Sequence, residues 1–511
     1  MGTPYLIGLD IGTSGVKGIV ISQDGKTRAS ATESYPLSTP KPNWAEQDPE
    51  DWWIATTKVL KQLTASIGTR KSDLKAIGLS GQMHSLVILD SESRVLMPSI
   101  LWCDTRTDRE CKWLNDTIGQ EDLRNLVANP ALEGFTLPKI LWVRDHEPDV
   151  YDRISKVLLP KDYIRYRLSG EFATEVSDAA GTLMFDVARR KWSEPILSKL
   201  SIPSSWLPAV FESVDVCGKV IRPVSDMTGL PEGIPIVGGG ADNACGAVGC
   251  GVVKEGRVLA GIGTSGVVLA HSAVVRSDPE MRAHTFCHGV PHSWYVMGVI
   301  LMAGGAFRWY KDTFCRGEIE RAEAKGVDVY DLLTQEAETV RPGSDGLFFL
   351  PYLNGERTPH RSASARGAFI GATIRHEKRH FSRSVLEGIT FAMRDSLEII
   401  KRLGIPLHQI RLTGGGAKSR FWRQLQADVY GREVALVNSM EGPAFGAALM
   451  AGVGAGMYAD LAEVTEELVA VTETLEPTDR SLVYDEQYQI FSSLYPALSK
   501  SFDRIHRHII Q

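Results

Sequence analysis

The sequence predicts an α/β protein built from two similar domains that face each other across a central cleft. The string Ile-Gly-Thr-Ser-Gly-Val occurs twice, at 11–16 and at 262–267. Short apolar strand patterns that pass through glycines into helical patterns recur in both halves of the chain. The chain has 511 residues, which is too long for a single hydrophobic core and suits two or three domains.

The first repeat lies in a predicted β-hairpin over residues 6–22. Apolar residues run into Asp10, small residues at 12–15 form a tight turn, and the apolar pattern resumes at Val16. Such a turn presents backbone N–H groups and hydroxyls that can bind phosphate oxygens, and a carboxylate at the strand end can hold Mg²⁺ or its waters. The same turn also occurs in proteins that bind nothing, and it is not a Walker loop, because no Gly-Lys-Ser/Thr opens a helix.

The second repeat, at 257–270, predicts a matching hairpin in the second half of the chain. Two such hairpins suggest two similarly built halves facing one ligand. No low-complexity linker separates the halves, so we place the boundary near 250–256. The expected domains are residues 1–252 and 253–511, with packing of the terminal helix back on the first domain left open.

Several elements follow the first hairpin in chain order. A third strand is expected at 27–35. A helix is expected next, with Asp48 as its N-cap, Pro49 as its first residue, acidic residues in its first turn and its end near residue 67. Strand 74–80 comes next, and helices are expected at 104–117, 137–146 and 161–168. The segment 177–182 is rich in turn residues and is either a site loop or a connection.

A Gly-Gln-Met-His motif at 81–84 directly follows the strand at 74–80. Ligands of open α/β sheets gather beyond strand ends, so Met83 and His84 are candidate ligand contacts. A lone histidine in such a place is more often structural, and the motif alone leaves both interpretations open.

Asp242 and Asn243 follow a short strand and three glycines, and they open a small-residue helix. Glycines permit close backbone approach, and the N-terminus of a helix favours an ionised carboxylate. A functional carboxylate is one interpretation of Asp242; a simple N-cap residue is the other.

The second half repeats the plan of strand, glycine turn and helix. One predicted strand is followed by Gly304 and Gly305 and then by a helix that ends near residue 310. Another strand is followed by a triple-glycine turn at 414–416 and then by a further helix. Helices are also expected at 381–403, 443–452 and 482–505.

Composition limits the classes of function. The net charge of −6 gives no electrostatic reason to expect nucleic acid or an anionic membrane as a partner. We find no long apolar stretch that could span a bilayer and no room for a secretory signal before Asp10. Seven cysteines without a C-x-x-C pair are typical of thiols in a reducing compartment, so we expect a cytoplasmic protein.

Duplicated phosphate hairpins with a ligand between them resemble the actin-like superfamily and its ribonuclease-H-like fold. Within it, the chain resembles the FGGY family of carbohydrate kinases over almost its whole length. The motifs that carry this resemblance lie at 10–15, 44–53, 81–84, 161–170, 238–246, 261–266, 367–371 and 414–419. The resemblance implies an α/β fold of two ribonuclease-H-like (actin-like ATPase) domains with a central cleft.

The motif at 81–84 resembles the branch of this family that acts on D-xylulose, whereas glycerol kinases carry an Arg-Glu pair there. The resemblance therefore implies transfer of the ATP γ-phosphoryl group to O5 of D-xylulose, giving D-xylulose 5-phosphate and ADP. A kinase for another ketose or polyol, such as D-ribulose, L-xylulose or a hexulose, is the nearest alternative. A non-catalytic actin-like protein that binds nucleotide or sugar is a more distant one.

The same resemblance implies roles for individual residues. Asp242 would be the general base, and Asp10 would serve Mg²⁺ and the phosphates. The sugar would be lined by Met83, His84, Asp242 and Asn243. ATP would be bound by Gly12, Thr13, Lys17, Gly263, Thr264, Gly304, Gly305, Gly415, Gly416 and Arg420. The expected partners are a ketose sugar, ATP, ADP and a second copy of the chain in a homodimer.

Overall fold

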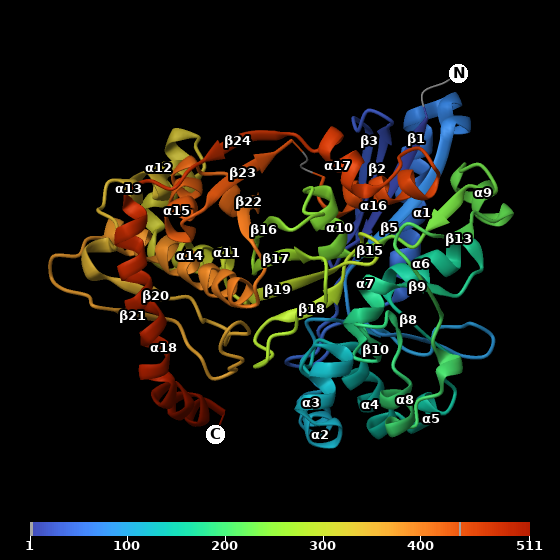
Figure 1. Ribbon diagram of the computed structural model, residues 1–511, viewed down its shortest axis with the longest axis horizontal. Helices are drawn as coiled ribbons and strands as arrows, with labels where there is room; N and C mark the ends of the chain where they lie inside the picture. The colour runs from blue at the N-terminus through green and yellow to red at the C-terminus, as the bar shows by residue number, and fades with distance from the viewer. Residues whose placement is uncertain (1–3, 439–440, 511) are drawn as a thin grey trace.

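Two mixed β-sheets of seven strands each organise the computed structural model, which describes residues 4–438 and 441–510 (Figure 1). The first sheet has the order β13 (Val216–Lys219), β14 (Pro235–Val237), β5 (Leu74–Gly81), β1 (Tyr5–Ile11), β2 (Gly15–Ser22) and β3 (Thr27–Ser34), and β15 (Gly240–Ala241) pairs with the end of β5. The second sheet has the order β18 (His284–Cys287), β19 (Trp294–Ile300), β17 (Gly266–Ser272), β16 (Gly256–Ile262), β22 (Leu407–Gly414), β23 (Glu433–Val437) and β24 (Val471–Leu475).

The two sheets share the same local plan, which confirms the duplicated hairpins. β1 pairs antiparallel with β2 and parallel with β5, and β16 pairs antiparallel with β17 and parallel with β22. The expected two-domain α/β fold is therefore correct. We call the part of the chain around the first sheet lobe 1 and the part around the second sheet lobe 2.

Ten helices and four small strand pairs belong to the first half of the chain among the described residues. The helices are α1 (Pro49–Ile67), α2 (Asp108–Ile118), α3 (Gln120–Asp122), α4 (Thr136–His146), α5 (Pro148–Tyr151), α6 (Pro160–Ser169), α7 (Val176–Ala179), α8 (Glu194–Leu200), α9 (Arg222–Thr228) and α10 (Asp242–Gly249). The strand pairs are β4 (Glu46–Gln47) with β7 (Ser99–Ile100), β6 (Val87–Leu89) with β8 (Lys156–Leu158), β9 (Ala173–Glu175) with β12 (Ala209–Phe211), and β10 (Phe185–Asp186) with β11 (Lys191–Trp192).

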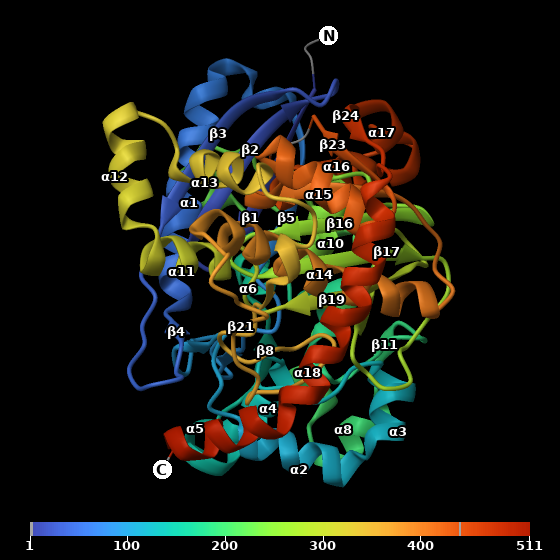
Figure 2. The same ribbon diagram turned by 90° about the vertical axis from the view of Figure 1, so that its left-hand side faces the viewer.

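The second half of the chain adds eight further helices among the described residues. They are α11 (Gly304–Phe314), α12 (Arg316–Lys325), α13 (Val329–Glu338), α14 (Lys378–Arg402), α15 (Arg420–Tyr430), α16 (Pro443–Gly454), α17 (Leu461–Leu468) and α18 (Arg480–Ile510). A small pair of strands, β20 (Phe348–Leu350) and β21 (Ala368–Ile370), lies beside α14. Figure 2 shows α18 crossing the outer face of lobe 2, where it packs on α14 and α15.

One helix from the second half packs on the first sheet. α16 lies against β1, β5 and α10, and Figure 1 shows it among the strands of lobe 1. Gly8 and Gly78, which are paired across β1 and β5, permit this contact. A Cβ at Gly8 would lie 1.9 Å from the carbonyl oxygen of Ala444, and one at Gly78 would lie 1.9 Å from that of Ala447. Only glycine fits either position without moving the helix.

Local signals explain most of the helix boundaries. Asp48 caps α1 by accepting from the backbone N–H of Glu50, and Pro49 is the first helical residue, as expected from the sequence. The turn-rich segment at 177–182 differs from a simple loop, because it forms α7 and a 3₁₀ turn and is buried throughout. Glu175 stabilises α7 by accepting from the backbone N–H groups of Ser177 and Asp178.

Candidate functional site

The ends of three parallel strands bring two carboxylates to one edge of the first sheet. Asp10 of β1 pairs with Ser80 of β5, and Gly240 of β15 pairs with the same Ser80 on the other side. Asp242 follows Gly240 by two residues and opens α10. Ser80 Oγ donates a hydrogen bond to Asp10 Oδ1 at 2.9 Å. The sheet thus places Asp10 and Asp242, which are 232 positions apart in the sequence, at the same strand edge.

Both carboxyl groups are harder to ionise than in water. Burial and the negative charge of Asp10 raise the pKa of Asp242 to about 7, although hydrogen bonds from Asn243 oppose this shift. Burial also raises the pKa of Asp10, while Ser80 and the charge of Lys17 act in the opposite direction. A nearby cation would favour the ionised forms of both groups.

The structure does not support a simple capping role for Asp242. The N-cap of α10 is Ala241, which makes no side-chain capping bond, and Asp242 is the first helical residue. Asp242 Oδ1 accepts from the backbone N–H of Asn243 at 2.7 Å and from its Nδ2 at 3.0 Å. These bonds orient one carboxylate oxygen, and the other makes no hydrogen bond with the described residues.

Met83 and His84, which follow β5, lie beside Asn243 of α10. Asn243 Nδ2 is 3.6 Å from Met83 Sδ, which links α10 to the segment after β5. His84 Nδ1 lies 2.6 Å from the carbonyl oxygen of Gly181, and because a carbonyl only accepts, Nδ1 carries the proton. Burial lowers the pKa of His84 to about 3, so the ring is neutral and its Nε2 is an acceptor.

Contacts from lobe 1 fix the position of His84. Its ring centroid is 4.4 Å from that of Phe135, and its backbone has a positive φ of 67°. The carbonyl oxygen of His84 accepts from Thr136 Oγ1 and from Lys139 Nζ, both at 3.0 Å. Burial lowers the pKa of Lys139 to about 7. No individual signal in the sequence pointed to this role of Lys139, because the contact joins segments 55 positions apart.

The tip of the first hairpin is tied to neighbouring segments through Thr13. Thr13 Oγ1 accepts from Trp102 Nε1 at 2.9 Å and donates to Gln82 Oε1 at 3.3 Å, and its carbonyl oxygen accepts from Gln47 Nε2 at 2.7 Å. The turn itself is closed by a bond from the Gly12 N–H to the Gly15 carbonyl at 3.1 Å. Gln47 lies within the motif at 44–53, and the structure gives it the role of supporting Thr13.

Lys17 lies on β2 opposite Asp10, yet its ammonium is engaged elsewhere. Lys17 Nζ forms an ion pair of 2.6 Å with Glu441, which precedes α16. Both side chains are partly exposed. The pair lies beside the hairpin, so Lys17 would have to exchange Glu441 for a phosphate in order to bind nucleotide.

A pocket of about 330 Å³ surrounds the tip of the second hairpin. It gathers most of the nucleotide residues expected in lobe 2: Gly263, Thr264, Gly304, Gly415 and Gly416. Close backbone approach requires Gly304, since a Cβ there would lie 2.4 Å from the Gly263 carbonyl oxygen. The Gly305 N–H donates to the Thr264 carbonyl oxygen at 2.9 Å and so joins the start of α11 to the turn of the second hairpin.

Aromatic and polar side chains complete this pocket. Phe307, Tyr330 and Trp422 supply flat apolar surface, and Arg308, Asp328 and Ser419 supply polar groups. Arg308 Nη2 lies 3.4 Å from Thr264 Oγ1. The pocket therefore combines a glycine-lined end next to the hairpin with an aromatic end, which suits a phosphate tail and a flat base.

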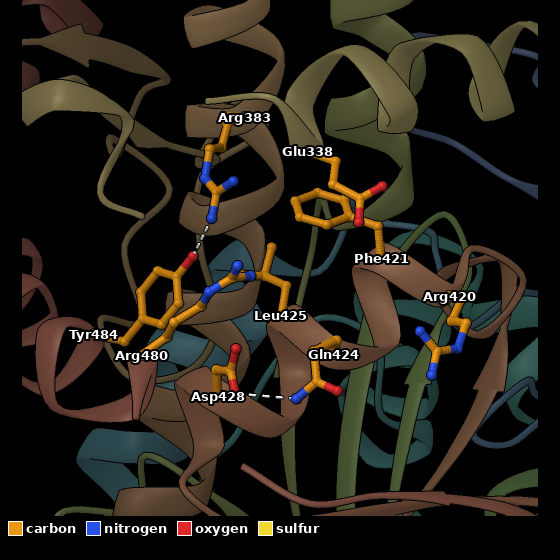
Figure 3. A pocket seen from close by; sticks show the side chains of 9 residues that line it. All are labelled: Glu338, Arg383, Arg420, Phe421, Gln424, Leu425, Asp428, Arg480 and Tyr484. Carbon is orange, nitrogen blue, oxygen red and sulfur yellow. Dashed lines mark hydrogen bonds between the residues drawn. The ribbon is translucent and has the colours of Figure 1, made fainter. Parts of the chain in front are cut away.

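Arg420 does not line this pocket. Its side chain is largely exposed and lies at the edge of a second cavity of about 380 Å³ on another face of α15. Figure 3 shows Arg420 in that cavity with Gln424, Asp428 and Tyr484. The structure thus separates Arg420 from the other nucleotide residues expected from the sequence.

The described part of the chain contains no group of three or more His, Cys, Asp or Glu residues placed to hold a metal. The donor set at the strand edge is the pair of carboxylates of Asp10 and Asp242. This set fits Mg²⁺, which takes oxygen ligands and is commonly bound through one or two carboxylates together with substrate phosphates.

Two lobes of like plan, with matching hairpins and a glycine-lined pocket, define an α/β fold of the actin-like ATPase class. The N-terminal domain model of the FGGY family of carbohydrate kinases matches residues 5–249, and its C-terminal domain model matches residues 258–455. The chain belongs to the FGGY family of carbohydrate kinases.

Individual relatives agree over nearly the whole chain. The chain is 40% identical to a xylulose kinase of Bacillus subtilis, covering 96% of both chains. It is 39% identical to a xylulose kinase of Escherichia coli, covering 96% of this chain and 99% of the relative. The solved structure of xylulose kinase from Rhodospirillum rubrum has a TM-score of 0.90 at 32% identity, covering 98% of this chain and all of that chain.

None of the described helices is both long and apolar enough to cross a membrane. All seven cysteines lie among the described residues and are free thiols, and six of them are buried.

Proposed function

We propose that this chain transfers the γ-phosphoryl group of ATP to O5 of D-xylulose, giving D-xylulose 5-phosphate and ADP. The observation that carries the proposal is the pair of Asp10 and Asp242 at the strand edge of lobe 1, beside the Met83, His84 and Asn243 cluster. The full-length relatives that are named xylulose kinases support the choice of sugar.

Phosphoryl transfer depends mainly on positioning and on stabilisation of charge. The backbone N–H groups of Thr13 and Thr264 are the proposed phosphate contacts, because the N–H groups of Gly12 and Gly263 close their own turns by bonding the carbonyl oxygens of Gly15 and Ser265. They come from opposite lobes, so the phosphates would lie between the hairpins. The glycine-lined pocket beside Thr264 would hold the nucleoside.

Asp242 is the proposed general base. A carboxylate whose pKa is near 7 accepts a proton better than an ordinary aspartate and is still largely ionised just above neutral pH. The proton of the O5 hydroxyl becomes acidic late in the transfer, and Asp242 accepts it then. The bonds from Asn243 orient the carboxylate for this role.

Asp10 and the phosphates of ATP would together hold Mg²⁺. When bound, the ion neutralises charge that develops on the phosphate oxygens. Ser80 holds the carboxylate of Asp10 in place through the bond to Oδ1. The neutral ring of His84 and the amide of Asn243 would bind sugar hydroxyls, and Met83 would supply an apolar contact.

A panel assay tests the proposed activity. ADP release is measured with D-xylulose, D-ribulose, L-xylulose, a hexulose and glycerol, and the phosphorylated product is identified by ³¹P NMR. We expect the highest kcat/KM for D-xylulose and a product phosphorylated at O5. A clear preference for another sugar would show that D-xylulose is not the main substrate, and ADP release that no sugar stimulates would contradict the proposal.

A cytoplasmic location, a homodimer and the absence of nucleic-acid partners stay proposals from the sequence. The domain boundary at 252–253 is also a proposal; it falls between α10 and β16.

A further inference from the structure

A loop of lobe 2 places Arg357 at the contact between the two lobes. This loop lies between β20 and β21 and is bonded to β19: Thr358 N–H donates to the Val299 carbonyl oxygen at 3.0 Å, and Thr358 Oγ1 accepts from the Val299 N–H at 3.0 Å. Just beyond the strand, the Leu301 N–H donates to Glu356 Oε1 at 2.9 Å. The backbone on both sides of Arg357 is therefore held firmly by lobe 2.

The side chain of Arg357 extends to lobe 1. Its Nη2 lies 3.8 Å from the position that a Cβ on Gly134 would occupy. Gly134 belongs to the segment that supports His84, because Lys139 Nζ bonds the carbonyl oxygens of both residues. The positive charge of Arg357 also contributes to the lowered pKa of His84. The guanidinium therefore lies close to the His84 end of the proposed sugar site.

This guanidinium has no partner within residues 4–438 and 441–510. It makes no side-chain hydrogen bond and no ion pair there, although Glu133 and Glu356 are close enough to act on its charge. Burial lowers the pKa of Arg357. A partly buried cation with free donors is costly unless it is hydrogen-bonded, and a fork of five N–H groups suits oxygen acceptors.

The chemistry of the substrate supplies such an acceptor. Ring closure of D-xylulose to a furanose uses O5, so a molecule that accepts phosphate at O5 is in the open-chain form. That form has a ketone oxygen at C2, three carbons away from C5. Arginine only donates hydrogen bonds and a ketone oxygen only accepts them, so the two groups match without a competing donor.

The residues of the proposed sugar site follow one another from Asp242 to Arg357. Asp242 adjoins Asn243, whose amide contacts Met83, and His84 follows directly with Arg357 near its ring. Asp242 would face O5, which leaves Arg357 at the other end.

We propose that Arg357 of lobe 2 binds the C2 carbonyl oxygen of the open-chain ketose, and so both selects ketoses over polyols and joins the lobes around the sugar. This inference rests on the proposed function, since it assigns one end of that same substrate. It makes Arg357 a specificity-determining residue.

The test compares Arg357→Met and Arg357→Lys with the wild-type protein. We expect KM for D-xylulose to rise about 10- to 100-fold in Arg357→Met, because a hydrogen bond to a charged group is lost. Lysine keeps the charge but not the fork, so Arg357→Lys should lie between the two. KM for ATP should stay at the wild-type value. Arg375→Met, at an exposed position in the same lobe, is the matched control and should leave both KM values unchanged.

Ligand-induced thermal shifts provide the second readout. The shift in Tm produced by D-xylulose should fall in Arg357→Met, whereas the smaller shift produced by xylitol, which lacks the carbonyl, should not change. The Tm without sugar should stay close to that of the wild type, because the guanidinium has no partner in the described fold.

Three results would overturn the inference. One is a wild-type KM for D-xylulose in Arg357→Met. Another is an equal loss of the shifts produced by D-xylulose and xylitol. The third is unfolding of both Arg357 variants, which would make the residue structural. A wild-type protein without activity on D-xylulose would instead refute the proposed function, so the two failures can be told apart.

Discussion

Replacing Asp242 with asparagine should abolish turnover and stabilise the fold at the same time. The substitution keeps the shape of the side chain and an oxygen that can accept from the Asn243 N–H, which is bonded at 2.7 Å to Asp242 Oδ1. It removes the charge that burial and Asp10 disfavour. The buried carboxylate of Asp242 is thus expected both to lower the free energy of unfolding and to act as the catalytic base.

The size of both effects follows from the environment of Asp242. Loss of a general base typically lowers kcat by about 10²- to 10⁴-fold. A tenfold change in proton affinity corresponds to about 1.4 kcal/mol, so raising the pKa from 3.8 to about 7 costs the ionised form on the order of 4 kcal/mol at most. Asp242 retains some contact with solvent, so we expect a gain of about 1–3 kcal/mol for the asparagine variant.

The sign of this gain depends on pH. Between pH 4 and pH 7 the folded protein keeps a proton on Asp242 that the unfolded chain has lost, so the stability of the wild type falls as pH rises through this window. Asparagine does not titrate, so the variant does not lose stability in this way as pH rises. Its advantage should be small below pH 4 and complete above about pH 8.

Urea unfolding at several pH values, together with steady-state kinetics, measures both effects. Asp479→Asn, at an exposed aspartate, is the matched control and should change neither. A stability difference that does not vary with pH would refute the buried-charge argument. A kcat close to that of the wild type would remove Asp242 from the role of base.

Three further predictions address the fold, the pH profile and the metal. Gly78→Ala should lower the free energy of unfolding by at least about 2 kcal/mol, because the new Cβ would meet the Ala447 carbonyl oxygen of α16. The control Gly317→Ala, on α12 with open space around it, should be neutral or stabilising. Equal effects of the two substitutions in urea titrations would contradict the packing argument. The kcat/KM for the sugar should fall as pH decreases through about 7, since protonation of Asp242 removes the base, and a flat profile from pH 5 to pH 8 would contradict that assignment. Excess EDTA should abolish turnover and added Mg²⁺ should restore it, whereas full activity in EDTA would argue against a metal at Asp10.

Local sequence signals predicted much of the fold correctly. The paired hairpins depend on alternating apolar residues and small turn residues, and α1 depends on Asp48 and Pro49 at its start. These signals act within a few residues, so they can be read without the structure. The strand-end argument singled out Met83 and His84, whereas the meeting of Asp10 and Asp242 at one strand edge depends on the pairing of β1 and β15 with β5, which the sequence does not show.

Long-range contacts were not predictable in the same way. The return of α16 to lobe 1 depends on Gly8 and Gly78, whose importance appears only once the helix lies against them. The ion pair of Lys17 with Glu441 joins residues that are far apart in the sequence. The direction of Arg420 depends on which face of α15 meets the nucleotide pocket, and a residue at the first position of a helix can point either way.

A crystal structure with D-xylulose and a non-hydrolysable ATP analogue would test the site most directly. We predict that O5 of the sugar lies within hydrogen-bond distance of the Asp242 carboxylate, that the triphosphate lies between the turns at Thr13 and Thr264, and that the base occupies the pocket beside Trp422. A nucleotide bound in the cavity at Arg420, or a sugar whose O5 is remote from Asp242, would contradict this arrangement.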